Sequence, residues 1–184
     1  MRSFIAIELP EAWRRTLADA TAPLRRDLKD LSWVAPERLH VTLTFLGEVD
    51  QPTLSRLRPR LERAAERTAS FELQLGSGGR FGHRVLYAKV CGDRAQLIRL
   101  AERTTAASRR GGIEVTDASR RPHVTLARAR KQADLRPFTV ALKDLHAPSW
   151  RVTDVTLLKS VLAPDPHYET IAQFPLAQPP ASDF

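Results

Sequence analysis

The chain has 184 residues, of which 42% are hydrophobic, and it carries a formal net charge of +8. This length fits one domain or two small packed lobes, and the hydrophobic fraction is enough for a core, which excludes a disordered chain. No apolar stretch approaches the roughly 20 residues that a membrane span requires, and a single cysteine, Cys91, excludes a disulfide framework or a cysteine-rich zinc site.

Arginine dominates the basic residues, since only five of the 29 lysines and arginines are lysine. Guanidinium groups bind phosphates in a bidentate manner, so this composition favours an anionic partner such as nucleic acid. A GC-rich genome that places arginine on solvated surfaces would give the same composition. The apolar run after Arg2 is interrupted by Glu8 and Pro10, so we expect no signal peptide and a cytoplasmic protein.

Strand and helix patterns alternate in the first part of the chain. Residues 2–9 predict a strand, and Pro10 and Glu11 suit the first turn of a helix. Pro23 is expected to divide this helix, with Thr21 as a new cap. The apolar stripe of the helix is expected to comprise Trp13, Leu17, Ala20, Leu24, Leu28 and Leu31. A second strand is predicted at residues 39–46.

The middle of the chain continues this alternation. Asp50 is expected to cap a helix with an apolar stripe of Leu54, Leu57, Leu61 and Ala64. Residues 71–75 alternate as a half-buried strand, the glycines at 76, 78 and 79 indicate a turn, and residues 85–90 predict a further strand. Asp93 is expected to open a third helix, which Gly111 and Gly112 end.

The remainder of the chain is rich in strand patterns. Strands are predicted at residues 123–128, 137–143, 152–162 and 167–174, followed by a loosely held proline-rich tail over 175–184. This order predicts an α+β fold with helices on the outer faces of largely antiparallel sheets. No linker divides the chain, so we expect one domain over residues 1–184.

A repeated tetrapeptide is the most specific signal. His-Val-Thr-Leu occurs at residues 40–43 and again at 123–126, a separation close to half the chain length, which suggests two similar lobes about an approximate two-fold axis. Alternate residues of a strand share a face, so His40 points with Thr42, and His123 points with Thr125. Two such strands facing across a cleft would place two imidazoles around one bound group.

Paired imidazoles suit in-line cleavage of a phosphodiester. One acts as general base on water and the other as general acid on the leaving ribose oxygen, while threonine hydroxyls donate to the phosphoryl oxygens. The sequence contains no metal-ligand motif and no P-loop, so neither a metal nor another cofactor is expected. A single His-Val-Thr-Leu would more often be a structural strand histidine, but two copies at half-length favour an active site.

The residues around these motifs resemble the 2H phosphoesterase superfamily, and within it the bacterial and archaeal RNA 2′,3′-cyclic phosphodiesterases, historically called 2′-5′ RNA ligases. The fragments that carry the resemblance are RSFIAIELP, LHVTLTFLGEV, GGRFGHRVLYAKV, RRPHVTLAR and SVLAPDPHYETIAQFPL. The resemblance implies a bilobal fold with a pseudo-two-fold cleft between two antiparallel sheets. It also implies hydrolysis of a terminal 2′,3′-cyclic phosphate to a 2′-phosphate without ATP or metal.

The same resemblance implies roles for five residues. His40 would be the general acid, His123 the general base, and Thr42 and Thr125 would hold the phosphate. Arg128 matches an arginine that the family uses near the phosphate, but strict strand alternation places it opposite His123, so a bulge or the strand end must redirect it.

Other aromatic and histidine residues receive weaker interpretations. Alternation predicts that Phe45 belongs to the core, and Tyr168 fits the cleft and a half-buried strand equally well. The remaining histidines, His83, His146 and His167, are expected to be solvated loop residues.

Several functions stay open on the sequence alone. The same histidines could catalyse the reverse reaction, which forms a 2′-5′ bond, or cleave 2′-5′-linked oligonucleotides, tRNA fragments or cyclic nucleotides. A non-catalytic, basic RNA-binding module is disfavoured because the chain has no aromatic motif of the kind that RNA readers use. A monomer is expected because the two-fold symmetry would be internal to the chain.

Overall fold

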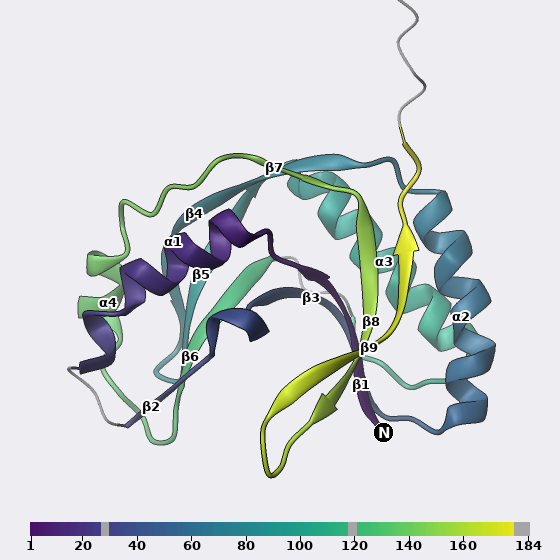
Figure 1. Ribbon diagram of the computed structural model, residues 1–184, viewed down its shortest axis with the longest axis horizontal. Helices are drawn as coiled ribbons and strands as arrows, with labels where there is room; N and C mark the ends of the chain where they lie inside the picture. The colour runs from purple at the N-terminus through teal and green to yellow at the C-terminus, as the bar shows by residue number, and fades with distance from the viewer. Residues whose placement is uncertain (27–29, 118–120, 179–184) are drawn as a thin grey trace, which may run out of the picture.

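The computed structural model describes residues 1–26, 30–117 and 121–178, which form a strongly curved sheet flanked by helices (Figure 1). The α-helices are α1 (Glu11–Thr21), α2 (Gln51–Glu66), α3 (Arg94–Arg110) and α4 (Arg136–Ala141). The strands are β1 (Arg2–Glu8), β2 (Leu31–Trp33), β3 (His40–Glu48), β4 (Phe71–Phe81), β5 (Val85–Gly92), β6 (His123–Ala129), β7 (Trp150–Val152), β8 (Asp154–Val161) and β9 (His167–Pro175). The predicted α+β class is confirmed.

The strands form one sheet in the order β7-β4-β5-β6-β3-β1-β8-β9, with β2 also paired to β6. We call β3, β1, β8 and β9 the His40 half, and β6, β5, β4, β7 and β2 the His123 half. The two halves meet through one residue pair, Val41 of β3 with Val124 of β6. The two sheets that the resemblance implies are therefore joined into one sheet at a narrow junction between the repeated tetrapeptides.

The halves exchange helices across this junction. Helix α1 follows β1 of the His40 half, yet its Trp13 packs edge-on against Trp150 of β7 in the His123 half, with ring centroids 5.3 Å apart. Helix α3 follows β5 of the His123 half, yet Thr104 on α3 forms a hydrogen bond of 2.9 Å with Thr44 on β3. Helix α4 packs on β4, α3 packs on β3 and on α2, and α2 packs on β9 (Figure 1). Each half is thus packed against a helix that follows a strand of the other half.

The predicted helices α2 and α3 are confirmed. The Asp50 carboxylate accepts a hydrogen bond of 2.8 Å from the Thr53 amide, and the predicted stripe of α2 is buried. Gly111 ends α3 and Gly112 adopts a left-handed φ of 86°, a conformation that glycine accepts without strain.

The first helix is shorter than predicted. Helix α1 ends at Thr21, whose hydroxyl donates to the Leu17 carbonyl at 2.8 Å and caps no second helix. Leu31 belongs to β2, a strand that the helical spacing did not predict. Leu28 lies outside the described residues. The assignment of one long stripe was wrong because Leu31 pairs with Ala129 of β6 instead of continuing the helix.

The predicted glycine turn was also wrong, because β4 continues through the glycines, with a bulge at Gly76 and Ser77 where its pairing with β5 shifts register. A Cβ at Gly78 would lie 2.6 Å from Leu142, and one at Gly79 would lie 2.5 Å from the Tyr87 ring. These glycines permit close approach of neighbouring side chains, and the chain turns later, at Gly82 with a φ of 55°.

Residues 137–143 are not a strand, since most of them lie in α4. Pro137 occupies the first turn of the helix, where its missing N–H carries no cost. Leu135, Phe138 and Leu142 are buried at helical spacing. The β-branched Thr139 and Val140 favour a strand locally, but burial at helical spacing stabilises the helix.

The beginning of the predicted loose tail is held by hydrogen bonds. The Leu176 amide donates to Thr153, and Ala177 exchanges backbone hydrogen bonds with Thr68 and Ser70. Residues 179–184 lie outside the described part. Within residues 1–26, 30–117 and 121–178, no helix combines the length and apolar character needed to cross a membrane.

Candidate active site

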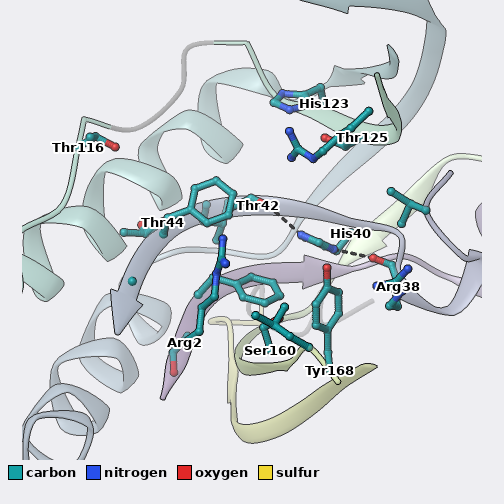
Figure 2. A pocket seen from close by; sticks show the side chains of 18 of the residues that line it. Arg2, Arg38, His40, Thr42, Thr44, Thr116, His123, Thr125, Ser160 and Tyr168 are labelled. Carbon is teal, nitrogen blue, oxygen red and sulfur yellow. Dashed lines mark hydrogen bonds between the residues drawn. The ribbon is translucent and has the colours of Figure 1, made fainter. Parts of the chain in front are cut away.

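A pocket of about 880 Å³ lies over the junction between the two halves. It is lined by all five predicted site residues, namely His40, Thr42, His123, Thr125 and Arg128. Figure 2 shows His123 and Thr125 on one side of this space and His40 and Thr42 on the other. The fold thus brings the two tetrapeptides together across the narrow junction.

The His40 imidazole is fixed through both ring nitrogens. Nδ1 lies 2.7 Å from the Arg38 carbonyl oxygen, which can only accept, so a neutral ring carries its proton on Nδ1. Nε2 therefore has a lone pair and accepts a hydrogen bond of 2.9 Å from the Thr42 hydroxyl. This bond follows from the shared strand face of the two residues.

His123 is fixed in the same way on the opposite strand. Its Nδ1 lies 2.8 Å from the carbonyl oxygen of Arg121, again two residues earlier in the chain. The neutral ring therefore directs the unprotonated Nε2 away from the backbone. Both imidazoles are thus held in the tautomer that a general base requires at Nε2.

The surroundings lower the pKa of both histidines. Burial lowers the pKa of His40 to about 4, and the positive charge of Arg128 contributes, against the opposing hydrogen bond to Arg38. Burial also lowers the pKa of His123, and Arg128 again contributes. Both rings are therefore neutral at neutral pH in the free protein, and a bound anion would raise both pKa values.

Matching irregularities occur at the leucine of each tetrapeptide. In the pairing of β1 with β3 the register skips Leu43, and in the pairing of β5 with β6 it skips Leu126. Each skip is a β-bulge, which reverses the alternation of the side chains that follow. Consequently Arg128 lies on the same side as His123 and lines the pocket.

The equivalent bulge in β3 overturns the prediction for Phe45. This residue is not in the core: its relative exposure is 62% and it lines the pocket. Phe45 and Arg128 each follow a histidine by five residues, so they occupy equivalent positions in the repeat. Alternation without a bulge predicts the wrong face for both.

Aromatic rings support the two histidines differently. His40 packs against Phe4 at 4.9 Å and against the edge of Tyr168 at 5.3 Å, measured between ring centroids. Tyr168 thus reaches the pocket, and Figure 2 shows its hydroxyl end directed at His40. His123 packs against Phe81 at 4.8 Å and Tyr87 at 5.3 Å.

Two further arginines line the pocket that the motifs did not indicate. They are Arg2 at the start of β1 and Arg38, whose carbonyl orients His40. The position of Arg38 two residues before the histidine was visible in the sequence, whereas Arg2 reaches the pocket only because β1 pairs with β3.

The other histidines lie elsewhere. His83, His146 and His167 are exposed and do not line the pocket, although His167 belongs to β9 and not to a loop. In the part of the chain that the structure describes, no three histidine, cysteine or acidic side chains are grouped as metal ligands would be.

Comparison with known proteins relates the chain to a known family. Residues 9–163 match the model of the 2′-5′ RNA ligase superfamily. The RNA 2′,3′-cyclic phosphodiesterase of Geobacillus stearothermophilus is 30% identical over 96% of the chain, which spans 58% of that relative's length. The enzyme of the same name from Thermus thermophilus is 31% identical, with 96% of the chain and 90% of the relative covered. The solved structure of Thermus thermophilus TT0787 superposes with a TM-score of 0.80 at 31% identity, covering 97% of this chain and 99% of the other.

Proposed function

Because the chain belongs to the 2′-5′ RNA ligase superfamily, we propose that it hydrolyses the 2′,3′-cyclic phosphate at an RNA end. The observation that carries the proposal is the placement of two imidazoles, each anchored at Nδ1, on opposite sides of one arginine-lined pocket. Relatives named RNA 2′,3′-cyclic phosphodiesterase support the substrate.

In the proposed reaction, His123 Nε2 takes a proton from water as the oxygen attacks phosphorus. The bond from phosphorus to the ribose O3′ breaks, His40 donates a proton to that oxygen, and a 2′-phosphate remains. His40 must gain its proton when the anionic substrate binds, because its pKa in the free protein is about 4.

Thr42 links the proton on His40 to phosphate binding. In the free protein the Thr42 hydroxyl is oriented toward Nε2 of the neutral ring. Once protonated, Nε2 becomes a donor, and the threonine hydroxyl is released to donate to a phosphoryl oxygen. Thr125 and Arg128 would bind the other oxygens, and the bidentate guanidinium suits the charge that accumulates there.

The reaction is proposed to need neither metal nor ATP, because two imidazoles supply both proton transfers. Turnover of a cyclic-ended oligonucleotide in EDTA, without ATP, is the expected result. Loss of activity in EDTA that added metal restores would contradict the metal-free mechanism.

Substitution separates the two histidine roles. His40→Ala and His123→Ala should each lower kcat on a cyclic-ended oligonucleotide by about 10²–10⁴-fold, the usual contribution of a positioned acid or base. A nitrophenyl phosphodiester has a leaving group that departs without a proton. His40→Ala should therefore retain much more activity on this ester than His123→Ala does. The reverse ranking would exchange the two roles, and full activity of both variants would refute the site.

Ligation to a 2′-5′ linkage is a second candidate, favoured by the superfamily to which the chain belongs. Ligation is the same chemistry with the ribose hydroxyl of a second RNA replacing water, so the same two proton transfers serve it. Incubation of a cyclic-ended RNA with a 5′-hydroxyl RNA, followed by separation of hydrolysed and joined products, measures the ratio of the two reactions.

A further inference from the structure

The pocket extends beyond the two tetrapeptides along β1 and β3. Its lining also includes Arg2, Gly47 and Asp117. At about 880 Å³ the pocket lies near the upper end of the range that encloses a drug-sized ligand. It therefore has room for groups of the substrate beyond the reacting phosphate.

Arg2 directs its side chain from the start of β1 into this space, toward Thr42 and Thr44 (Figure 2). The nearby carboxylates already have partners: Glu48, opposite Arg2 in the strand register, pairs with the Met1 amino group at 3.2 Å, and Asp117 pairs with Arg109 at 2.8 Å. Among the described residues, no ion pair or hydrogen bond engages the Arg2 guanidinium. Its charge is thus directed into the pocket without compensation by an acid.

The strand register separates Arg2 from the reacting phosphate. Thr42 pairs with Ala6, and Arg2 lies four residues earlier on β1, which at about 3.3 Å per residue is roughly 13 Å of backbone. The arginine side chain points back along part of this distance. Its guanidinium therefore lies between the start of β1 and the position where Thr42 and Thr125 would hold the reacting phosphate.

We propose that Arg2 binds the phosphodiester next to the terminal cyclic phosphate and thereby selects oligonucleotide ends over nucleoside cyclic phosphates. A bidentate guanidinium recognises such a non-bridging oxygen pair, and a mononucleotide has none at this position. The inference rests on the proposed function and adds a second anchoring point on the RNA strand.

The test compares two substrates, a nucleoside 2′,3′-cyclic phosphate and a trinucleotide ending in the same cyclic phosphate. Arg2→Gln should reduce the ratio of kcat/KM for the trinucleotide to kcat/KM for the mononucleotide about tenfold, the effect of losing one charge-assisted hydrogen bond. The salt dependence of log kcat/KM on the trinucleotide should become shallower by about 0.7, as expected for one fewer phosphate contact on a single strand. Arg2→Lys should retain part of the preference.

Arg63→Gln is the matched control, because Arg63 is exposed on α2 and does not line the pocket. It removes the same charge and should leave the substrate ratio and the salt slope as in the wild type. Thermal unfolding of each variant tests whether the fold is retained.

An unchanged ratio in Arg2→Gln, or the same change in Arg63→Gln, would overturn the proposal. Equal loss on both substrates would also overturn it, because Arg2 would then act at the reacting phosphate or on the fold. Failure of the wild type to hydrolyse either substrate would instead refute the proposed function, so the two failures are distinguishable.

Discussion

At the scale of single residues, the two histidines are held alike but surrounded differently. Both donate from Nδ1 to the carbonyl two residues earlier. Of the two, His40 has a threonine hydroxyl on Nε2, and its ring packs against Phe4 and Tyr168, which partly bury it. The pocket thus contains two chemically unequal imidazoles, as the proposed general acid and general base require.

The low pKa of His40 predicts loss of stability in acid. The unfolded chain binds a proton at this ring below about pH 6.5, whereas the folded chain does so only near pH 4, so the free energy of unfolding falls as the pH drops between these values. Between pH 7 and pH 4.5, the free energy of unfolding of the wild type should fall by about 2 kcal/mol more than that of His40→Gln. Urea unfolding at the two pH values measures the difference.

His83→Gln provides the control for this experiment, because His83 is exposed in the turn between β4 and β5. It should follow the wild type at both pH values. If the free energy of unfolding fell equally in the wild type and in His40→Gln, burial of the His40 ring would not be the cause of the acid sensitivity.

At the scale of elements, the bulges at Leu43 and Leu126 determine which side chains enter the pocket. After each bulge two successive residues face the interior, and the next one, Phe45 or Arg128, faces the pocket. In β3 the second interior residue is Thr44, which forms buried hydrogen bonds with Thr104 and Thr105 of α3. These hydrogen bonds attach the bulged segment of β3 to α3.

The close contact between β4 and the Tyr87 ring predicts an effect on His123. In Gly79→Ala the new methyl group would overlap the Tyr87 ring, which stacks on Phe81 at 4.3 Å and contacts His123. Displacement of the ring should lower kcat/KM about tenfold or more, since misplacement of a catalytic group by about 1 Å costs up to 10²-fold. Steady-state assays on a cyclic-ended oligonucleotide measure the change.

Gly76→Ala is a control on the same strand. Its Cβ would overlap Cys91 and Lys89 and not Tyr87, so it should destabilise the protein with a smaller effect on turnover by the folded fraction. If both variants lose activity only in proportion to unfolded protein, the support of His123 by Tyr87 is contradicted.

At the scale of the whole molecule, the exchange of α1 and α3 between the halves makes the pocket depend on the complete chain. The only direct strand pairing of β3 with β6 is the Val41–Val124 pair. The contacts of Trp13 with Trp150 and of Thr44 with Thr104 also hold the two halves together, because each joins a helix to a strand of the other half. The distance between the two imidazoles is therefore fixed by packing around the sheet more than by hydrogen bonds within it.

The net charge of +8 predicts electrostatic attraction of RNA. For a cyclic-ended oligonucleotide, kcat/KM should fall several-fold between 50 and 200 mM salt, with a logarithmic slope of about −0.7 for each phosphate contacted. The value of kcat should change much less, because bound substrate is already neutralised. Measuring both constants across this range checks the prediction, and a flat kcat/KM would show that the charge does not assist substrate capture.

The sequence by itself determined the elements whose pattern is local. A period of two places His40 with Thr42 and His123 with Thr125, and a helical period with a capping aspartate gives α2. These predictions succeed because neighbouring residues along the chain suffice to define the shared face.

Only the tertiary structure decided the rest of the pocket. Arg128 and Phe45 face it because partner strands skip one residue, and Arg2 enters it because β1 lies beside β3. Leu142 and Tyr87 occupy the space that side chains at Gly78 and Gly79 of β4 would need, and the pKa of His40 falls because its ring is buried beside Phe4 and Tyr168. Each of these outcomes depends on residues far apart in the chain, so no local period in the sequence reveals it.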